Sequence, residues 1–274
     1  MRNYLSECIG KLVELKPAIR IGLLTAIVVI LLVVWEIAVR LTHTQGLVPL
    51  PSGVVRSGIA LTEDGTLMQA LASSLERVII GFAIAAAIGI PIGLAIGTVP
   101  LLDRTLRPVL DGLRGVAPIA WIPMAILWLG VRGDAALFVV AYAAVFPFIL
   151  NTSEAARRIP RSLFHAAESL GASRLLLLRS VVLPGALPFV FTGARIAMAF
   201  AWGSIIAAEL AIGIKVSTAK RAVAGIGQMM VDTLYVRRDV DALVLYMIVI
   251  GIVSFLIDSG LRHAQARLMP WTQQ

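Results

Sequence analysis

Long apolar runs separated by short polar segments dominate this chain. A helix needs roughly 20 mostly apolar residues to cross the hydrocarbon core of a bilayer. At that length the pattern predicts about six membrane-spanning helices, near residues 20–40, 73–98, 107–130, 134–152, 182–212 and 240–261. Pro108, Pro118 and Pro123 invite bends in the third of these spans. The polar segments between them are too short for a separate soluble domain. We therefore expect an all-α integral membrane protein with one transmembrane domain over 20–264, preceded by a segment 1–19 and followed by a tail 265–274.

The composition agrees with a membrane protein. Of the 274 residues, 59% are hydrophobic and only 15% are charged, against about 25% charged in soluble domains. The first apolar run follows about twenty residues that include several charges and is not followed by a small-residue cleavage site, so we expect an anchor rather than a signal peptide. Cys8 is the only cysteine, which excludes a disulfide within the chain and leaves the compartment undetermined.

The distribution of Lys and Arg predicts the orientation, because basic residues in short loops stay on the cytoplasmic side. Basic residues before the first span and in the loop 153–181 place both segments in the cytoplasm. One loop disagrees, since counting places the basic segment between the last two spans outside; its cations are Lys215, Lys220, Arg221, Arg237 and Arg238. Such a loop attracts an anionic solute or docks an acidic protein, or it rests on anionic lipid headgroups.

The loop 153–181 has a local pattern of its own, which continues into the stretch HAAESLGASRLLLLRSVVLP at 165–184. Pro160 suits the first turn of a helix, Gly171 suits the left-handed residue that ends it, and Ser173 suits the cap of a following helix. We therefore expect a short helix, a turn and a second helix entering the membrane. Small side chains would let another protein approach closely, although a solvated connector would have the same pattern.

The same residues resemble a known motif. Ala166-Ala167, three residues, Gly171, nine residues and then Val181-Val182-Leu183-Pro184 is similar to the cytoplasmic coupling motif of binding-protein-dependent ABC importer permeases. Further segments, such as LRGVAPIAWIPMAILWLGV and LPFVFTGARIAMAFAW, resemble the permeases for nitrate, bicarbonate, taurine and alkanesulfonates, and the taurine and sulfonate members most. The resemblance covers almost the whole chain after residue 20.

The resemblance implies the transmembrane domain of a type I ABC importer, with about six transmembrane helices and a cytoplasmic coupling helix. The residues that it assigns to contact with the ATPase are His165, Ala166, Ala167, Glu168, Gly171, Leu183 and Pro184. His165 departs from the family pattern, which usually has Glu there. The stretch 213–224 is also more basic than its counterpart in the family.

The resemblance further implies a set of partners. These are two copies of an ATPase subunit that binds ATP and Mg, a second copy of this chain, and an extracytoplasmic substrate-binding protein that docks near Lys215, Lys220 and Arg221. We expect membrane lipid but no nucleic acid as a further partner, and a bacterial cytoplasmic (inner) membrane location with the N-terminus inside. The substrate would be a small anionic or zwitterionic solute, moved by alternating access.

A search for chemistry within the chain is consistent with a permease rather than an enzyme. The sequence lacks the phosphate-binding loop G-x-x-x-x-G-K-[ST], so we expect no ATP site or other cofactor in this chain. Its three histidines, His43, His165 and His263, are too scattered for a zinc site. The alternative function is a self-sufficient secondary transporter of a small organic anion, but such a protein would be expected to show internal repeats, and we find none that convinces.

Charged residues inside the predicted spans are costly and usually face a partner or a wet pathway. Arg77, Arg114, Arg195 and Glu209 are of this kind, whereas Glu36 and Asp258 lie nearer to span ends. Arg195 and Glu209, fourteen residues or about 21 Å apart on one helix, cannot pair with each other. We expect Arg114 and Arg195 to be buried members of structural or gating ion pairs, with contact to a substrate anion as the alternative.

Three tryptophans and three glycines complete the set of candidates. Trp121, between Pro118 and Pro123, is a candidate wall of the translocation path, and so is Trp202; Trp128 suits an interfacial anchor. Gly89, Gly93 and Gly97 share one helix face, which predicts close packing within the chain and, as an alternative, a pivot or dimer seam.

Overall fold

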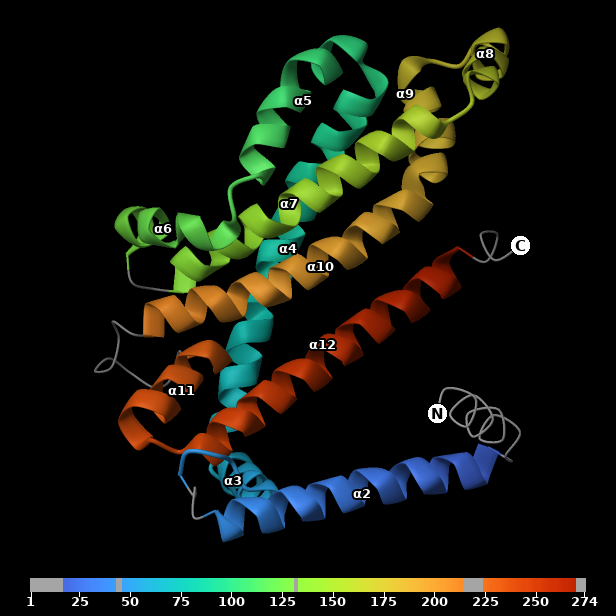
Figure 1. Cartoon of the computed structure of the whole chain (residues 1–274). Helices are drawn as coiled ribbons and strands as arrows, with labels where there is room; N and C mark the ends of the chain where they lie inside the picture. The colour runs from blue at the N-terminus through green and yellow to red at the C-terminus, as the bar shows by residue number, and fades with distance from the viewer. Residues whose placement is uncertain (1–16, 43–45, 131–132, 214–223, 270–274) are drawn as a thin grey trace, which may run out of the picture.

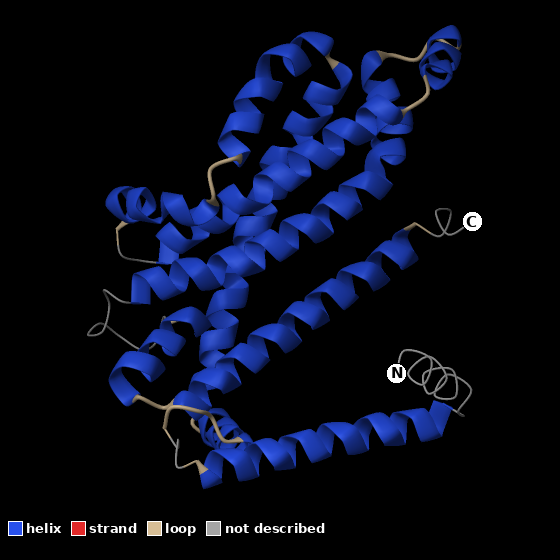
Figure 2. Ribbon diagram, in the orientation of Figure 1, coloured by secondary structure: helices blue, strands red, loops and turns tan. Residues whose placement is uncertain are grey.

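The computed structural model describes residues 17–42, 46–130, 133–213 and 224–269. Every regular element in these ranges is a helix (Figure 2). In chain order they are α2 (Pro17–Leu41), α3 (Pro51–Glu63), α4 (Thr66–Thr98), α5 (Pro100–Arg114), η1 (Pro118–Trp121), α6 (Ile122–Leu129), α7 (Gly133–Arg158), α8 (Arg161–Ser169), α9 (Arg174–Leu177), η2 (Leu178–Val182), α10 (Leu183–Gly213), α11 (Ile226–Asp232), η4 (Thr233–Arg237) and α12 (Val240–Leu268).

The helices confirm an all-α membrane protein. Within the described ranges, four helical segments are long and apolar enough by that test to cross a bilayer, namely α4, α7, the segment Arg179–Gly213 that contains α10, and α12; the bent pair of α5 with η1–α6 would make a fifth. α2, with 25 residues, coincides with the first predicted span. The six ranges predicted from the sequence therefore correspond to α2, α4, the bent pair, α7, α10 and α12.

One predicted span is bent, as its prolines indicated. The range 107–130 is not a continuous helix, because α5 and the helical segment Pro118–Leu129 meet at an angle of 83°. Pro118 explains the break, since a residue before proline is driven out of the helical region, and Ala117 has an extended ψ of 136°. Pro108 and Pro123 cause no comparable break; Pro123 lies in the first turn of α6, where a missing N–H costs little.

The core of the bundle consists of α7 packed between α4 and α10 (Figure 1). Small residues allow this packing: a Cβ added at Gly89 or Gly93 of α4 would lie 2.7 Å from Phe148 Cβ or from the carbonyl oxygen of Ile149, both on α7. Gly97 fits against Ala156 and Ser153 of the same helix. The glycine face thus serves packing inside the chain, as expected, and not a seam between chains.

The two outer helices have looser contacts. The first part of α12 packs on α3, and Tyr246 is buried there with residues of α3, α4 and α11, whereas Val253 further along packs against α10. Few other residues of α12 are buried. α2 lies apart from the bundle (Figure 1), and Glu36 ties it to α3 by accepting hydrogen bonds from the amide (3.1 Å) and hydroxyl (2.7 Å) of Ser52. Among the α2 residues whose burial is described, only Val39 is buried.

The helix ends fall on two sides of the molecule. The start of α2, the end of α7, the start of α10 and the end of α12 lie toward the right of Figure 1, on the side that also carries α8. The end of α10, α11 and the start of α12 lie toward the left. The start of α2 and the loop 153–181 are therefore on the same side of the bundle, which is the relative arrangement that the charge distribution predicts.

Candidate functional site

The predicted coupling segment forms a helical projection at one end of the bundle (Figure 1). α8 follows the end of α7 after two residues, and α9 and η2 lead back into α10. α8 is amphipathic and only nine residues long, so its own hydrogen bonds do little to stabilise it. Its orientation depends on how the chain enters and leaves it.

The turn after α8 has the predicted geometry. Gly171 has φ of +77°, in the left-handed region, and the Ala172 amide donates to the Ala167 carbonyl oxygen at 3.0 Å. The Ser173 hydroxyl then accepts a hydrogen bond from the Leu176 amide at 3.3 Å and caps α9. These contacts confirm the helix, turn and second helix predicted from the sequence. The start differs slightly, because α8 begins at Arg161 and Pro160 precedes it.

The projection offers an apolar and small-residue surface. His165, Ala166 and Gly171 are exposed, and Ala167 is half-buried. Leu170, next to the turn, is 88% exposed, an unusual position for a leucine in water. A Cβ placed at Gly171 would touch nothing, so the space around the turn is open. Of the other predicted contact residues, Leu183 and Pro184 are exposed in the first turn of α10, and the side chain of Glu168 lies outside the described part.

The base of the projection is fixed to the bundle. Ile159 and Val182, which flank the projection in the chain, pack together with Ala156 in a small apolar cluster. Arg157 forms an ion pair with Asp103 of α5, and the Arg158 guanidinium lies over the Phe189 ring at 5.4 Å. A displacement of α8 would therefore be passed to α5, α7 and α10.

The other end of the bundle contains a buried charge. Glu209 of α10 has no exposed surface, and its carboxylate accepts hydrogen bonds from Arg77 Nη1 (2.8 Å) and Ser74 Oγ (2.9 Å) of α4. The Gly227 amide donates to Glu209 Oε2 at 3.0 Å, and the Ile226 amide donates to Ser74 Oγ at 2.9 Å. This network joins α4, α10 and α11.

Glycines make room for the network. A Cβ at Gly225 would collide with the Glu209 carboxylate, and one at Gly227 would lie 2.7 Å from Glu209 Cβ. Gly133, at the start of α7, similarly leaves space for Arg77 Nε. Sequence reasoning identified Arg77 and Glu209 as costly charges but missed that they pair. The available signals were Ser74 and Arg77, three residues apart on one helix face, and the Gly-Ile-Gly turn.

A second group of charges lies between α10 and α12. Arg195 binds Asp258 through Nε (3.2 Å) and Nη2 (3.1 Å), and Arg262 Nη1 lies 2.6 Å from the other oxygen of that carboxylate. Arg195 therefore has an ion-pair partner, but its side chain is 35% exposed rather than buried. Asp258, near the end of the predicted span 240–261, is bound to Arg195 in the middle of α10; the helix α12 itself continues to Leu268.

Arg114 differs from its prediction. It ends α5, its side chain is 51% exposed, and its ion-pair partner is Asp111 of the same helix at 3.1 Å. The expectation that it is buried within the chain is wrong, because the break before Pro118 places it at a helix end rather than inside a continuous span. Any role of Arg114 in the path would involve groups outside this chain's core.

The two predicted path tryptophans have different surroundings. Trp202 is buried between α10 and α12, where its indole N–H donates to the Ile250 carbonyl oxygen at 3.3 Å. Trp121 lies in an aromatic cluster, with ring centroids 5.2 Å from Tyr142 and 6.4 Å from Trp128. Its indole nitrogen is buried and has no hydrogen-bond partner among the described residues. Trp202 therefore supports helix packing, and Trp121 is the one with an unused donor.

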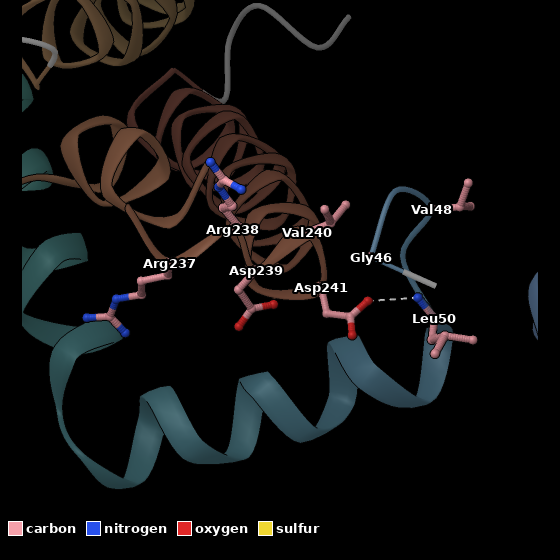
Figure 3. Close-up of a pocket in the computed structure, with 8 residues that line it drawn as sticks. All are labelled: Gly46, Val48, Leu50, Arg237, Arg238, Asp239, Val240 and Asp241. Atoms are coloured by element: carbon pink, nitrogen blue, oxygen red, sulfur yellow. Dashed lines mark hydrogen bonds between the residues drawn. The ribbon is translucent and has the colours of Figure 1, made fainter. Parts of the chain in front are cut away.

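The predicted docking residues Lys215, Lys220 and Arg221 lie outside the described residues. The described part of the same loop borders a cavity of about 270 Å³, shown in Figure 3. It is lined by Gly46, Val48, Leu50, Arg237, Arg238, Asp239, Val240 and Asp241. Asp241 accepts a hydrogen bond from the Leu50 amide at 2.8 Å, and Arg237 pairs with Asp232 at 3.0 Å.

The carboxylates of Asp232 and Asp241 offset part of the positive charge of this loop, which is the loop that disagreed with the orientation rule. In the described ranges, no group of three His, Cys, Asp or Glu residues could hold a metal ion.

Comparison with known proteins places the chain in context. Residues 68–270 match the family described as binding-protein-dependent transport system inner membrane component. The bicarbonate transport system permease protein CmpB of Synechocystis sp. is 36% identical over 76% of this chain and 71% of that protein. The taurine transport system permease protein TauC of Escherichia coli is 33% identical over 89% and 86%, and the nitrate import permease protein NrtB of Synechocystis sp. is 30% identical over 95% and 91%.

Solved structures share the fold. The MetNI methionine ABC transporter, in inward-facing conformations, matches with a TM-score of 0.62 at 19% identity, over 78% of this chain and 99% of the matched chain. A second crystal form of the same transporter gives a TM-score of 0.58 at 18% identity. The architecture is thus that of an ABC importer transmembrane domain.

Proposed function

The chain belongs to the family of binding-protein-dependent transport system inner membrane components, and from this premise we propose that it carries a small anionic or zwitterionic solute across the membrane by alternating access. It is a permease subunit of an ABC importer. Relatives named for bicarbonate, taurine and nitrate support this solute class. They do not favour one of these solutes over the others.

One observation carries the proposal: the projection formed by α8 and the Gly171 turn. Its exposed face of small and apolar residues suits insertion into a groove of another protein, and its base is fixed to α5, α7 and α10. Closure of a bound ATPase pair would pull on α8 and thereby move these helices between inward-open and outward-open states. The residues proposed to contact the ATPase are His165, Ala166, Ala167, Glu168, Gly171, Leu183 and Pro184.

The remaining partners follow from the same proposal. Two ATPase subunits would each bind ATP and Mg, and each would receive one coupling helix, so the permease would be a homodimer. The transmembrane domain would extend over 20–264, with the segments 1–19 and 265–274 in the cytoplasm. A substrate-binding protein would deliver the solute on the opposite side, at the end that contains α11 and the cavity.

The proposed solute path includes aromatic residues and charged residues. The unused indole N–H of Trp121 is buried, so it would reach an acceptor on the solute only if the surrounding aromatic cluster opened during alternating access. The Arg77–Glu209 pair, which ties α11 to the bundle, is suited to hold the outer end closed as a gate. Arg195 is the charged residue of the path proposed to meet the solute, and Arg114 and Trp202 complete the proposed set.

The docking of the binding protein has a separate test. If Lys215, Lys220 and Arg221 attract an acidic patch, their joint replacement by Gln should weaken binding at low ionic strength and have little effect at high salt, where charges are screened. Surface plasmon resonance with the binding protein at two salt concentrations measures this. Unchanged affinity at low salt would assign these residues to lipid contact instead.

Reconstitution tests the function itself. The purified chain alone, and the chain with its ATPase and binding protein, are placed in liposomes and assayed for uptake of radiolabelled taurine, nitrate and bicarbonate. We expect uptake only with all components and ATP. Uptake by the chain alone, driven by an ion gradient, would support the alternative of a secondary transporter.

A further inference from the structure

We propose that Arg195, Asp258 and Arg262 form an anion-accepting site on the solute path, in which the Asp258 carboxylate holds the place of the solute's anionic group. This inference rests on the proposed function as an importer of anionic solutes. It adds a binding site, and a resident counter-ion, to the path. The site would take carboxylate, sulfonate or similar oxyanions.

The geometry supplies the first support. Both oxygens of Asp258 are engaged, one by two nitrogens of Arg195 (3.2 and 3.1 Å) and the other by Arg262 (2.6 Å). Two guanidinium groups thus converge on one carboxylate, and guanidinium is the side chain best suited to bind oxyanions in a bidentate way. Another oxyanion of similar size could make the same contacts.

The charge balance supplies the second support. The group contains two cations and one anion, and the ion pairs of the described residues bring no second carboxylate to it. It therefore carries an excess positive charge. A solute anion that enters would neutralise this excess, and Asp258 would then compete with the solute for Arg195, which favours release as well as binding.

Exposure supplies the third support. The side chains of Arg195, Asp258 and Arg262 are 35%, 42% and 46% exposed, and Arg195 lies in the middle of α10. Charges exposed to hydrocarbon at such depth are costly and usually face water or protein. A water-filled pathway satisfies this requirement, and the excess positive charge would then attract an anionic solute.

Two exposed positions on α12 allow the proposed water-filled pathway to be tested. The face of α12 that packs on the bundle includes Ala242, Tyr246 and Val253. Ser254, one turn before Asp258, shares the side of the helix that carries the charges and is exposed. Leu256, 60% exposed, points about 160° away from Asp258 at nearly the same depth. The two positions separate a wet face from a lipid face.

The experiment uses thiol labelling of the full chain with its accompanying subunits in phospholipid nanodiscs. Cys8, the only cysteine, is first replaced by Ser. Ser254→Cys and Leu256→Cys are then treated with an anionic sulfonatoethyl methanethiosulfonate and with its cationic trimethylammonium analogue, and the rates are followed by mass spectrometry. We expect Ser254→Cys to react with both reagents and Leu256→Cys to react with neither.

Charge variants then test the preference for anions. In the Ser254→Cys background, Arg195→Gln or Arg262→Gln should lower the ratio of anionic to cationic labelling rates, and Asp258→Asn should raise it. For Asp258, one turn or roughly 6 Å from Ser254, each rate should change by about threefold even at the dielectric constant of water, and Arg262, two turns away, should change it less. Because a nearby charge alone would produce such shifts, protection is measured as well: saturating taurine or nitrate should slow the labelling of Ser254→Cys by the anionic reagent, and this protection should be lost with Arg195→Gln.

Two results would overturn the inference. If Ser254→Cys is as unreactive as Leu256→Cys, the charges face lipid or a second copy of the chain rather than water. If it reacts but the ratio does not respond to the charge variants, the face is wet but does not select anions. Arg262 lies nearest to the helix end, so Arg262→Gln is the charge variant least able to disturb folding. Size-exclusion profiles check that every variant is folded. Neither result bears on whether an ATPase binds the chain, so the proposed function is tested separately.

Discussion

Glu209 shows what a single residue contributes in this protein. Its carboxylate is fully buried, and Arg77, Ser74 and Gly227 together satisfy it. Such a pair is expensive to bury but far more expensive to break, because removal of one partner leaves an uncompensated charge. The pair therefore constrains α11 together with the apolar contacts of Ile226 and Met229.

Replacing Arg77 tests this reasoning. Arg77→Met should lower the free energy of unfolding by about 3–5 kcal/mol, because Glu209 would stay buried without its cation. The double variant Arg77→Met/Glu209→Gln should recover part of the loss, since the Gln side chain still accepts from the Gly227 amide. Denaturant titrations in detergent measure both. A double variant that is less stable than the single one would contradict the account.

Gly171 illustrates how far a residue's role could be predicted. Its left-handed conformation followed from a pattern that the structure confirms, because only glycine adopts φ of +77° without strain and helices often end in this way. The partners of Arg195 and Glu209 could not be predicted. They lie 63 and 132 residues away in the chain, and helix periodicity carries no information about contacts at that distance.

Substitutions at Gly171 separate conformation from surface shape. Gly171→Trp should abolish ATPase-coupled transport while the chain remains inserted, because it strains the turn and adds bulk to an open surface. Gly171→Asn should retain most of the coupling, since Asn tolerates the left-handed region. ATP hydrolysis by the purified complex and solute uptake are the measurements. Normal coupling in Gly171→Trp would refute the role assigned to the turn.

At the scale of elements, the close approach of α4 and α7 depends on glycines, while larger side chains such as Phe82 and Phe148 fill the space beside them. In a bilayer the hydrophobic effect does not drive helices together, so close backbone approach is what stabilises such pairs. The sequence predicted this from the spacing of Gly89, Gly93 and Gly97. The prolines of the span 107–130 predicted a bend, but not which of the three would break the helix or that the angle would reach 83°; the break lies at Pro118.

A matched pair of alanine substitutions tests the packing. Gly93→Ala puts a Cβ 2.7 Å from the Ile149 carbonyl oxygen and should destabilise the bundle by roughly 1–3 kcal/mol, the usual cost of overpacking. Gly203→Ala, in α10, meets nothing within 4 Å and should be neutral or slightly stabilising. Thermal unfolding in detergent compares them. Equal effects of the two substitutions would show that the glycine face does not set the helix separation.

At the scale of the whole molecule, the proposed contact with the ATPase and the proposed outer gate lie at opposite ends of the bundle. The projection of α8 lies at one end of the bundle, and the Arg77–Glu209 network with α11 lies at the other; α10 runs between them and carries Arg195 in its middle. A force applied at α8 therefore reaches the opposite end through one continuous helix. The sequence allowed the class, the spans and the coupling turn to be predicted, whereas the packing of α10 on α12 required coordinates.

The most direct test of the central claim is purification of the tagged chain from its native membrane in mild detergent, in parallel with the Gly171→Trp variant. Co-purifying proteins are identified by mass spectrometry, and ATP hydrolysis is assayed. The account predicts an ATPase in equimolar amount with the wild-type chain, with measurable hydrolysis, and its loss from the variant. Repeated preparations of the wild-type chain without an ATPase, together with solute uptake by that chain alone in liposomes, would contradict it.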